Sequence, residues 1–166
     1  MANDIVKNIS QLIVNDLSNS TTFGEYVIEL GVFSGNTTRK DETVSIGITN
    51  AELMFIHENG SPIRNIPERP VLQMTLNWAK DNIILETLAR CSDGLMKHSW
   101  TNEMIEKELN KMAIRIQKYA RDIIYSNDGR LEPNKPSTIA RKGDNHPLFD
   151  TGQLARSIRC KVIRIK

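Results

Sequence analysis

The sequence predicts an α+β fold in which a small antiparallel sheet packs with two long helices and an N-terminal helix. Three observations support this prediction. Apolar residues recur at helical spacing in several segments, β-branched segments alternate in hydropathy, and a long connection containing Pro and Gly precedes the last strand pattern. At 166 residues the chain fits one domain. We therefore expect a single α+β domain over residues 1–166, with residues 127–147 as a long extended loop or arm.

The first elements follow from local patterns. Residues 4–17 place apolar side chains at three- and four-residue steps behind Asn3, a potential N-cap, and predict an amphipathic helix. Residues 25–33 are β-branched and aromatic, which predicts a strand. Residues 43–49 alternate apolar and polar side chains, so they predict a second strand positioned to pair with the first.

The second half of the chain contains the longer helices. The apolar run at 51–57 is too short to separate strand from helix by pattern, and we expect a short helix. Pro70 suits the first position of a helix over about residues 69–90. The clearest helix runs from residue 101 to about 126, with one apolar stripe. Alternation at 158–162 predicts the closing strand.

Composition excludes several classes of protein. A hydrophobic content of 39% and a charged content of 25% are ordinary for a folded domain, and an aromatic content of 5% disfavours base-stacking platforms. No run of about 18 apolar residues suggests a membrane segment. Cys91 and Cys160 form no CxxC pattern, so we expect neither zinc nor a disulfide.

Charge is unevenly distributed along the sequence. Residues 1–110 contain 9 Lys and Arg against 15 Asp and Glu, whereas residues 111–166 contain 13 against 5. Such asymmetry fits a basic surface near nucleic acid, or head-to-tail packing between acidic and basic faces of neighbouring copies. The other interpretation is that folding interleaves the two halves and cancels the field. The sequence leaves both open.

One triplet, Asp150-Thr151-Gly152, matches the local pattern of an aspartic protease. That chemistry needs two carboxylates about 3 Å apart, which a half-size enzyme obtains by dimerising. Only 14 residues follow Gly152, too few for the rest of such a barrel. The structural interpretation places Leu148 and Phe149 in the core, uses Asp150 or Thr151 as a helix cap, and assigns tight packing to Gly152. We favour this interpretation and keep the dimeric protease using Asp150 as an alternative.

Other catalytic patterns are missing from the sequence. His57 adjoins Glu58, but sequence neighbours diverge on a helix, and no histidine has ligand-like spacing. No phosphate-binding glycine motif and no nucleophile elbow occurs, so we expect no cofactor, no metal and no catalytic residue. Basic residues over 156–166 leave a basic DNA-binding accessory domain as a second alternative, with a solvated strand edge as the plainer interpretation.

Two blocks of sequence together carry a family resemblance. The first is the apolar segment 50–60, which ends in His-Glu-Asn-Gly, followed by Ile-Pro-Glu-Arg-Pro at 66–70. The second is 135–142, followed by Pro-Leu-Phe-Asp-Thr-Gly-Gln-Leu at 147–154. In this order the blocks resemble the neck or tail-completion proteins of tailed bacteriophages, the phage virion morphogenesis family. The motif residues, which are also candidate assembly residues, are His57, Gly60, Pro67, Arg69, Pro70, Pro147, Leu148, Asp150, Thr151, Gly152 and Leu154.

The resemblance implies a structural virion protein rather than an enzyme. It would form a homo-oligomeric ring, hexameric or dodecameric, at the head-tail junction, as a tail-completion, tail-terminator or head-tail joining protein. The implied partners are head connector or stopper proteins, tail tube or sheath proteins, and DNA in the channel through non-specific contact; no membrane is involved. Assembly would take place in the host cytoplasm and the protein would reside in the virion. In physical terms, such copies pack through a heterologous interface that closes.

Overall fold

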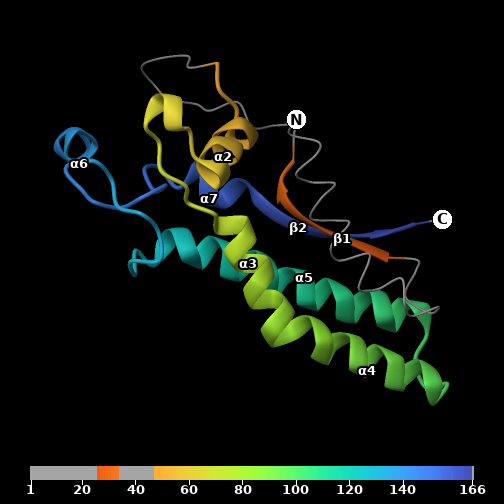
Figure 1. Cartoon of the computed structure of the whole chain (residues 1–166). Helices are drawn as coiled ribbons and strands as arrows, with labels where there is room; N and C mark the ends of the chain where they lie inside the picture. The colour runs from red at the N-terminus through yellow and green to blue at the C-terminus, as the bar shows by residue number, and fades with distance from the viewer. Residues whose placement is uncertain (1–25, 34–46, 166) are drawn as a thin grey trace. The chain divides into compact units, whose positions relative to one another are not determined.

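A computed structural model of the chain describes residues 26–33 and 47–165 (Figure 1). Its helices and two-stranded antiparallel sheet confirm the predicted α+β class. In chain order the elements are β1 (Tyr26–Val32), α2 (Asn50–Asn59), the 3-10 turn η1 (Pro62–Arg64), α3 (Val71–Ala79), the π-helical segment η2 (Lys80–Ile84), α4 (Leu85–Met96), α5 (Asn102–Tyr125), α6 (Pro136–Lys142), α7 (Gln153–Ser157) and β2 (Ile158–Arg164). The predicted helix over 4–17 lies outside the described residues.

The chain divides into two compact units. Of the described residues, 26–30, 75–118 and 160–165 form what we call the helical unit, and 31–33, 47–74 and 119–159 form the cleft unit. The described helical unit contains nine Lys and Arg against seven Asp and Glu, and the cleft unit contains nine against eight. Each unit draws on both halves of the sequence. The charge asymmetry along the sequence is therefore largely lost in the units, as the interleaving interpretation expects.

The core of the helical unit is built around α5. Ile105, Leu109, Met112 and Ile116 are each at most 3% exposed and follow the predicted stripe. The Thr101 hydroxyl accepts a hydrogen bond from the Met104 N–H at 3.3 Å and so caps the start of this helix. Periodic burial of branched apolar side chains therefore explains why the longest helix forms and which face turns inward.

The predicted helix over 69–90 is present as α3, η2 and α4, which follow one another without a break. Buried residues Ala79, Ile83, Thr87 and Cys91 recur at four-residue steps across it. A regular α-helix has 3.6 residues per turn, so steps of four drift around its surface. η2 is π-helical, and its wider turn corrects this drift, which keeps the four side chains on the inner face.

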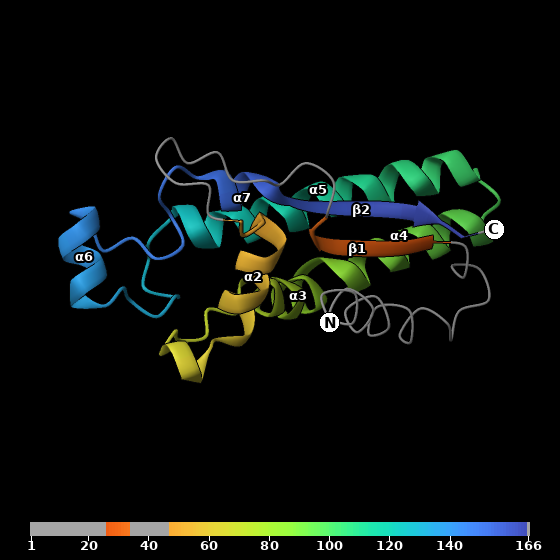
Figure 2. The ribbon, with the colours of Figure 1, turned by 90° about the horizontal axis from the view of Figure 1, so that it is seen from above.

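The sheet pairs the two ends of the described chain, because β1 lies beside β2 (Figure 2). Tyr26, Ile28 and Leu30 are buried along β1, and the strand prediction for this segment is confirmed. Of the second predicted strand, over residues 43–49, residues 43–46 lie outside the described residues and residues 47–49 belong to no named strand, so its pairing with β1 stays a prediction. Pairing partners depend on tertiary contacts, which the local pattern does not contain.

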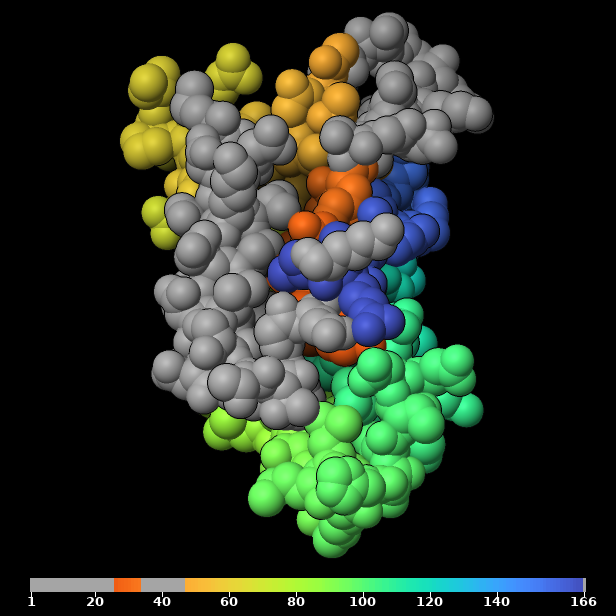
Figure 3. Space-filling model, turned by 90° about the vertical axis from the view of Figure 1, so that its right-hand side faces the viewer, coloured from red at the N-terminus to blue at the C-terminus, as the bar shows by residue number. Residues whose placement is uncertain are grey.

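The turn between α4 and α5 lies at the surface of the helical unit (green in Figure 3). Met96 is 79% exposed there. The Trp100 ring packs directly on Gly94, since a Cβ at Gly94 would lie 2.4 Å from Trp100 Cγ.

Both cysteines are free thiols, and burial raises the pKa of Cys160 to about 12.

Candidate functional site

The cleft unit contains an open cleft of about 910 Å³. One wall comes from α2 and η1, and the other comes from α6 and the segment 148–154. Figures 1 and 2 show α6 and the η1 turn at the same end of this unit. The lining residues are Ile48, Leu53, His57, Arg64, Asn65, Ile66, Pro67, Arg69, Asn134, Lys135, Thr138, Arg141, Lys142 and every residue from Leu148 to Leu154.

Arg69 connects the two walls through main-chain carbonyls. It is 5% exposed, and its Nε donates to the Glu132 carbonyl at 2.7 Å. Its Nη2 donates to the Pro133 carbonyl at 2.9 Å and to Asn134 Oδ1 at 3.5 Å, and Nη1 lies 3.5 Å from His57 Nδ1. The planar guanidinium spans several acceptors at once, which a lysine ammonium does not do. Arg69 thus holds the chain that leads into α6.

Glu58 fixes the start of α3 from the end of α2. Its two carboxylate oxygens accept hydrogen bonds from the Leu72 N–H at 3.0 Å and the Gln73 N–H at 2.8 Å. These N–H groups belong to the first turn of α3, where donors have no partner within the helix. Burial raises the pKa of Glu58, although both backbone hydrogen bonds lower it. The side chain therefore caps a helix that is distant in sequence.

Gly60 allows the chain to turn back after α2. Its φ is +66°, and a Cβ there would lie 3.0 Å from the Ile66 carbonyl oxygen. Ser61 and Ile66 then pair as an antiparallel bridge, with N–H to carbonyl distances of 2.8 and 2.9 Å. The Arg69 N–H donates to the His57 carbonyl at 2.7 Å. This turn therefore places Arg69 beside the C-terminal end of α2.

Lys142 and Leu148 define the loop on the other wall. The Lys142 ammonium donates to the His146 carbonyl at 3.0 Å and also to the Phe149 carbonyl. Leu148 has a φ of +59°, uncommon for a residue with a Cβ. Leu148 and Phe149 are only half-buried and line the cleft, so the prediction that both enter the core was wrong.

The Asp-Thr-Gly triplet forms the turn into α7, but not through a side-chain cap. Gly152 is itself the N-cap residue, with a φ of +73°, and no side chain caps this helix, so the cap predicted for Asp150 or Thr151 is wrong. The tight packing predicted for Gly152 is confirmed, because a Cβ there would lie 2.9 Å from Arg156 Nη1. The Arg156 guanidinium donates to the Thr151 carbonyl at 2.9 Å and closes the turn.

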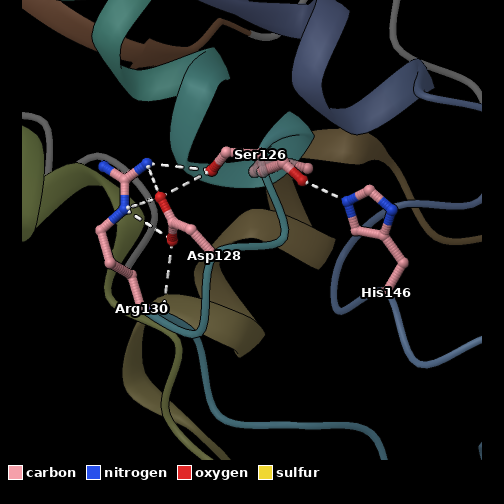
Figure 4. Close-up of polar contacts among 5 residues, drawn as sticks. Ser126, Asp128, Arg130 and His146 are labelled. Carbon is pink, nitrogen blue, oxygen red and sulfur yellow. Dashed lines mark hydrogen bonds and ion pairs between the residues drawn. The ribbon is translucent and has the colours of Figure 1, made fainter.

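Two polar contacts hold the chain after α5 (Figure 4). Arg130 Nε donates to both Asp128 oxygens, at 2.9 and 2.8 Å, and its Nη2 donates to Ser126 Oγ at 3.0 Å. The Arg130 guanidinium holds the pKa of Asp128 well below its usual range. His146 Nε2 lies 2.6 Å from the Ile124 carbonyl oxygen. The 127–147 connection, expected as a loop or arm, also contains the short helix α6.

Eight of the eleven motif residues line the cleft, although they come from two blocks far apart in sequence. These eight are His57, Pro67, Arg69, Leu148, Asp150, Thr151, Gly152 and Leu154. The other three lie elsewhere: Gly60 shapes the turn, Pro70 precedes α3, and Pro147 is buried. The two motif blocks therefore form one structural feature.

Apart from Arg69, the cations of this cleft were not among the candidate residues from the sequence. Arg64, Lys135, Arg141 and Lys142 line it together with Arg69, and Asp150 is the one carboxylate among the lining residues. The available signal was the three-residue spacing of Lys135, Thr138 and Arg141, which places Thr138 and Arg141 on one face of α6, with Lys135 at its N-cap. The Pro and Gly content of residues 127–147 hid this helical spacing.

Asp150 is exposed and lies in a bend before α7, not on a strand. Among residues 26–33 and 47–165, no three His, Cys, Asp or Glu side chains are grouped to hold a metal ion. Nor is any helix of this part long and apolar enough to cross a bilayer. Comparison with models of protein families, with curated proteins and with solved structures finds no match to this chain.

Proposed function

We propose that the chain is a structural protein of a tailed-phage virion that forms a homo-oligomeric ring at the head-tail junction. The observation that carries the proposal is the convergence of two motif blocks, 50–72 and 135–154, on one cleft. A single short match arises easily by chance. Here residues of both blocks line the same cleft, and Arg69 of the first block binds the carbonyls of Glu132 and Pro133, just before the second block, which supports one shared signature.

Exposed apolar side chains supply a physical reason for association. Leu85 is 72% exposed, Met96 79% and Ile114 65% in the helical unit, and Ile63 is 100% exposed in the cleft unit. Burial of such side chains by a neighbouring copy is favourable at about 25 cal/mol per Å² of apolar surface. If one patch of a copy packed on a different patch of the next copy, the contact would be heterologous and could close a ring. The tail tube, sheath and head connector would dock on the ring faces.

The oligomeric state tests this proposal directly. The purified chain should elute as a single multiple of its 18.8 kDa mass in size-exclusion chromatography with light scattering. Negative-stain images of that peak should show rings. A chain that stays monomeric at high concentration, and that joins neither purified heads nor tails, would contradict the proposal.

The variant Asp150→Asn separates assembly from the protease alternative. Asp150 is exposed and lies in a bend, and Asn has nearly the same size, so the substitution should leave the fold unchanged and assembly largely intact. An aspartic protease would lose its carboxylate and its activity. Cleavage of casein by the parent chain, abolished in Asp150→Asn, would favour the protease over the structural role.

A further inference from the structure

We propose that the cleft between α6 and the α2–η1 wall is a binding site for an acidic polypeptide segment of another chain. The segment would place carboxylates against Lys135 and Arg141 and apolar side chains against the apolar lining residues, such as Leu53, Ile66 and Leu154. The inference rests on the chemistry of the cleft and does not require that the chain forms a ring.

The cations of the cleft form no ion pair among the described residues, and the one nearby carboxylate that acts on them from outside the lining is Glu132, which stabilises the charge of Arg69. Arg69 and Lys142 donate mainly to main-chain carbonyls, which satisfies their N–H groups without cancelling their charge. Among the ion pairs of the described residues, none involves Arg64, Lys135 or Arg141. Five cations therefore face one lining carboxylate, that of Asp150. A concave surface with one sign of charge concentrates ligands of the opposite sign.

Asn134 also lines the cleft, but its one unpaired donor is enclosed by the protein. Its Oδ1 accepts from Arg69, which fixes the orientation of the amide, and its Nδ2 is buried without a hydrogen-bond partner. Buried polar atoms without partners are uncommon in folded proteins. The donors that a ligand in the cleft can reach are those of Arg64, Lys135 and Arg141, and a carboxylate, which offers only acceptors, complements them.

The walls favour a polypeptide over a nucleic acid. Leu53, Ile66 and Leu154 lie among the cations, so an occupant needs apolar side chains as well as negative charge. Single-stranded nucleic acids bind through bases stacked on aromatic rings. Phe149 and His57 are the aromatic rings of the lining; the Phe149 ring already stacks on His146 with centroids 4.5 Å apart, and His57 Nδ1 lies 3.5 Å from Arg69 Nη1. Phosphates could meet the cations, but the bases would lack a platform.

The experiment measures binding of a fluorescein-labelled octapeptide of alternating Glu and Leu to the purified full chain, by anisotropy. Saturable binding to the parent chain is expected, weaker at high salt. The double variant Lys135→Glu with Arg141→Glu should weaken it at least about tenfold, as expected when opposite charges become like charges. The matched control, Arg115→Glu with Lys118→Glu, makes the same charge change on exposed positions of α5 and should bind like the parent.

Three further probes give the result that would overturn the proposal. An octapeptide of alternating Lys and Leu should not bind, and an eight-nucleotide DNA or inorganic phosphate should not compete with the Glu peptide. Competition by DNA that the cleft variant abolishes would assign the cleft to nucleic acid instead. Equal loss in both double variants would show that net charge alone drives binding. Circular dichroism of each variant ensures that a lost signal reflects the cleft and not unfolding.

The outcome is separable from that of the ring proposal. A monomeric chain that binds the Glu peptide would overturn the ring and leave the cleft assignment standing. A chain that forms rings but does not bind the Glu peptide would support the ring proposal and overturn the assignment of the cleft. If the peptide dissociates an assembled ring, the natural occupant is an acidic segment of a second copy, which supports both.

Discussion

The helical unit and the cleft unit are stabilised in different ways. In the helical unit, side chains such as Ile83, Leu109 and Ile116 are buried at helical spacing, each at most 2% exposed. In the cleft unit, Arg69 and Glu58 bind main-chain groups of other segments. Seven of the eight residues with positive φ among the described residues also belong to the cleft unit. Periodic apolar burial builds the first unit, and individual polar contacts build the second.

This difference teaches where a substitution should be harmful. A buried apolar side chain in a helix is one of many similar contacts, and its loss costs stability in proportion to the cavity left behind. A buried arginine that satisfies several carbonyls has no substitute, and its loss leaves those acceptors without partners. Four predictions test this distinction.

The largest loss is expected from Ile116→Ala in the helical unit. Ile116 is 1% exposed, and truncation to Ala should lower the free energy of unfolding by about 2–5 kcal/mol. Urea denaturation followed by circular dichroism measures the change. Ile114→Ala is the matched control on the same helix, because Ile114 is 65% exposed and should cost less than about 0.5 kcal/mol. Equal losses at both positions would show that the assigned inner face of α5 is wrong.

In the cleft unit, Arg69→Ala should lower the free energy of unfolding by about 3 kcal/mol, because charged hydrogen bonds to two carbonyls are lost. Arg69→Lys keeps the charge but not the planar fork, and should recover only part of this loss. Arg64→Ala removes an exposed arginine of the same wall and serves as the control. If Arg64→Ala lowered the free energy of unfolding as much as Arg69→Ala, the hydrogen bonds of Arg69 to carbonyls would not explain the loss.

Gly94→Ala should lower the free energy of unfolding by about 1–2 kcal/mol, because the new methyl group overlaps Trp100. In an unobstructed helix the same change is stabilising by about 1 kcal/mol. Thermal or urea denaturation measures it. In a Trp100→Ala background the loss should shrink or change sign, and an unchanged loss there would disprove the steric explanation.

The smallest effect concerns Glu58, and it depends on pH. Because burial raises the pKa of Glu58 in the folded state above the ordinary 4.5, folding favours its protonated form. The stability that this difference contributes is fully present below about pH 4.5 and is lost as pH rises through the folded pKa. Glu58→Gln cannot ionise, so the stability of the parent relative to this variant should fall with rising pH in that window. A series of urea denaturations measures it, and a rise with pH would contradict the sign.

Much of the fold could be predicted because its patterns are local. The helix expected over about 101–126 matches α5 within a residue at each end, since one apolar stripe continues along its length. The short helix α2 was expected, and Thr49 with Glu52 forms a capping box at its start. Strand pairing could not be predicted, because β1 and β2 are separated by most of the chain and their register depends on tertiary packing.

The cleft was predictable only in part. The family resemblance predicted motif residues such as His57 and Asp150, and in the structure both line the same cleft. The partners of Arg69 could not be predicted, because carbonyl groups occur at every residue and carry no sequence signal. The basic face of α6 was missed because Pro136 and Gly143, which suggested a loop, are instead its first residue and its C-cap.

The π-helical segment η2 affects how the continuous helix formed by α3, η2 and α4 can tolerate an added or a deleted residue. Five-residue hydrogen-bonded turns accommodate one residue more than an α-helix needs, and each residue of an α-helix rotates the chain by about 100°. Deletion of one residue from η2, for example the exposed Asp81, should let α3 and α4 merge into a regular helix. The same deletion would rotate α4 about the helix axis relative to α3, so that Thr87 and Cys91 would no longer point in the same direction as Ala79. A π-helical turn such as η2 therefore accommodates one inserted residue within a single turn. The helix becomes longer, and the buried side chains before and after the insertion still lie on the same face.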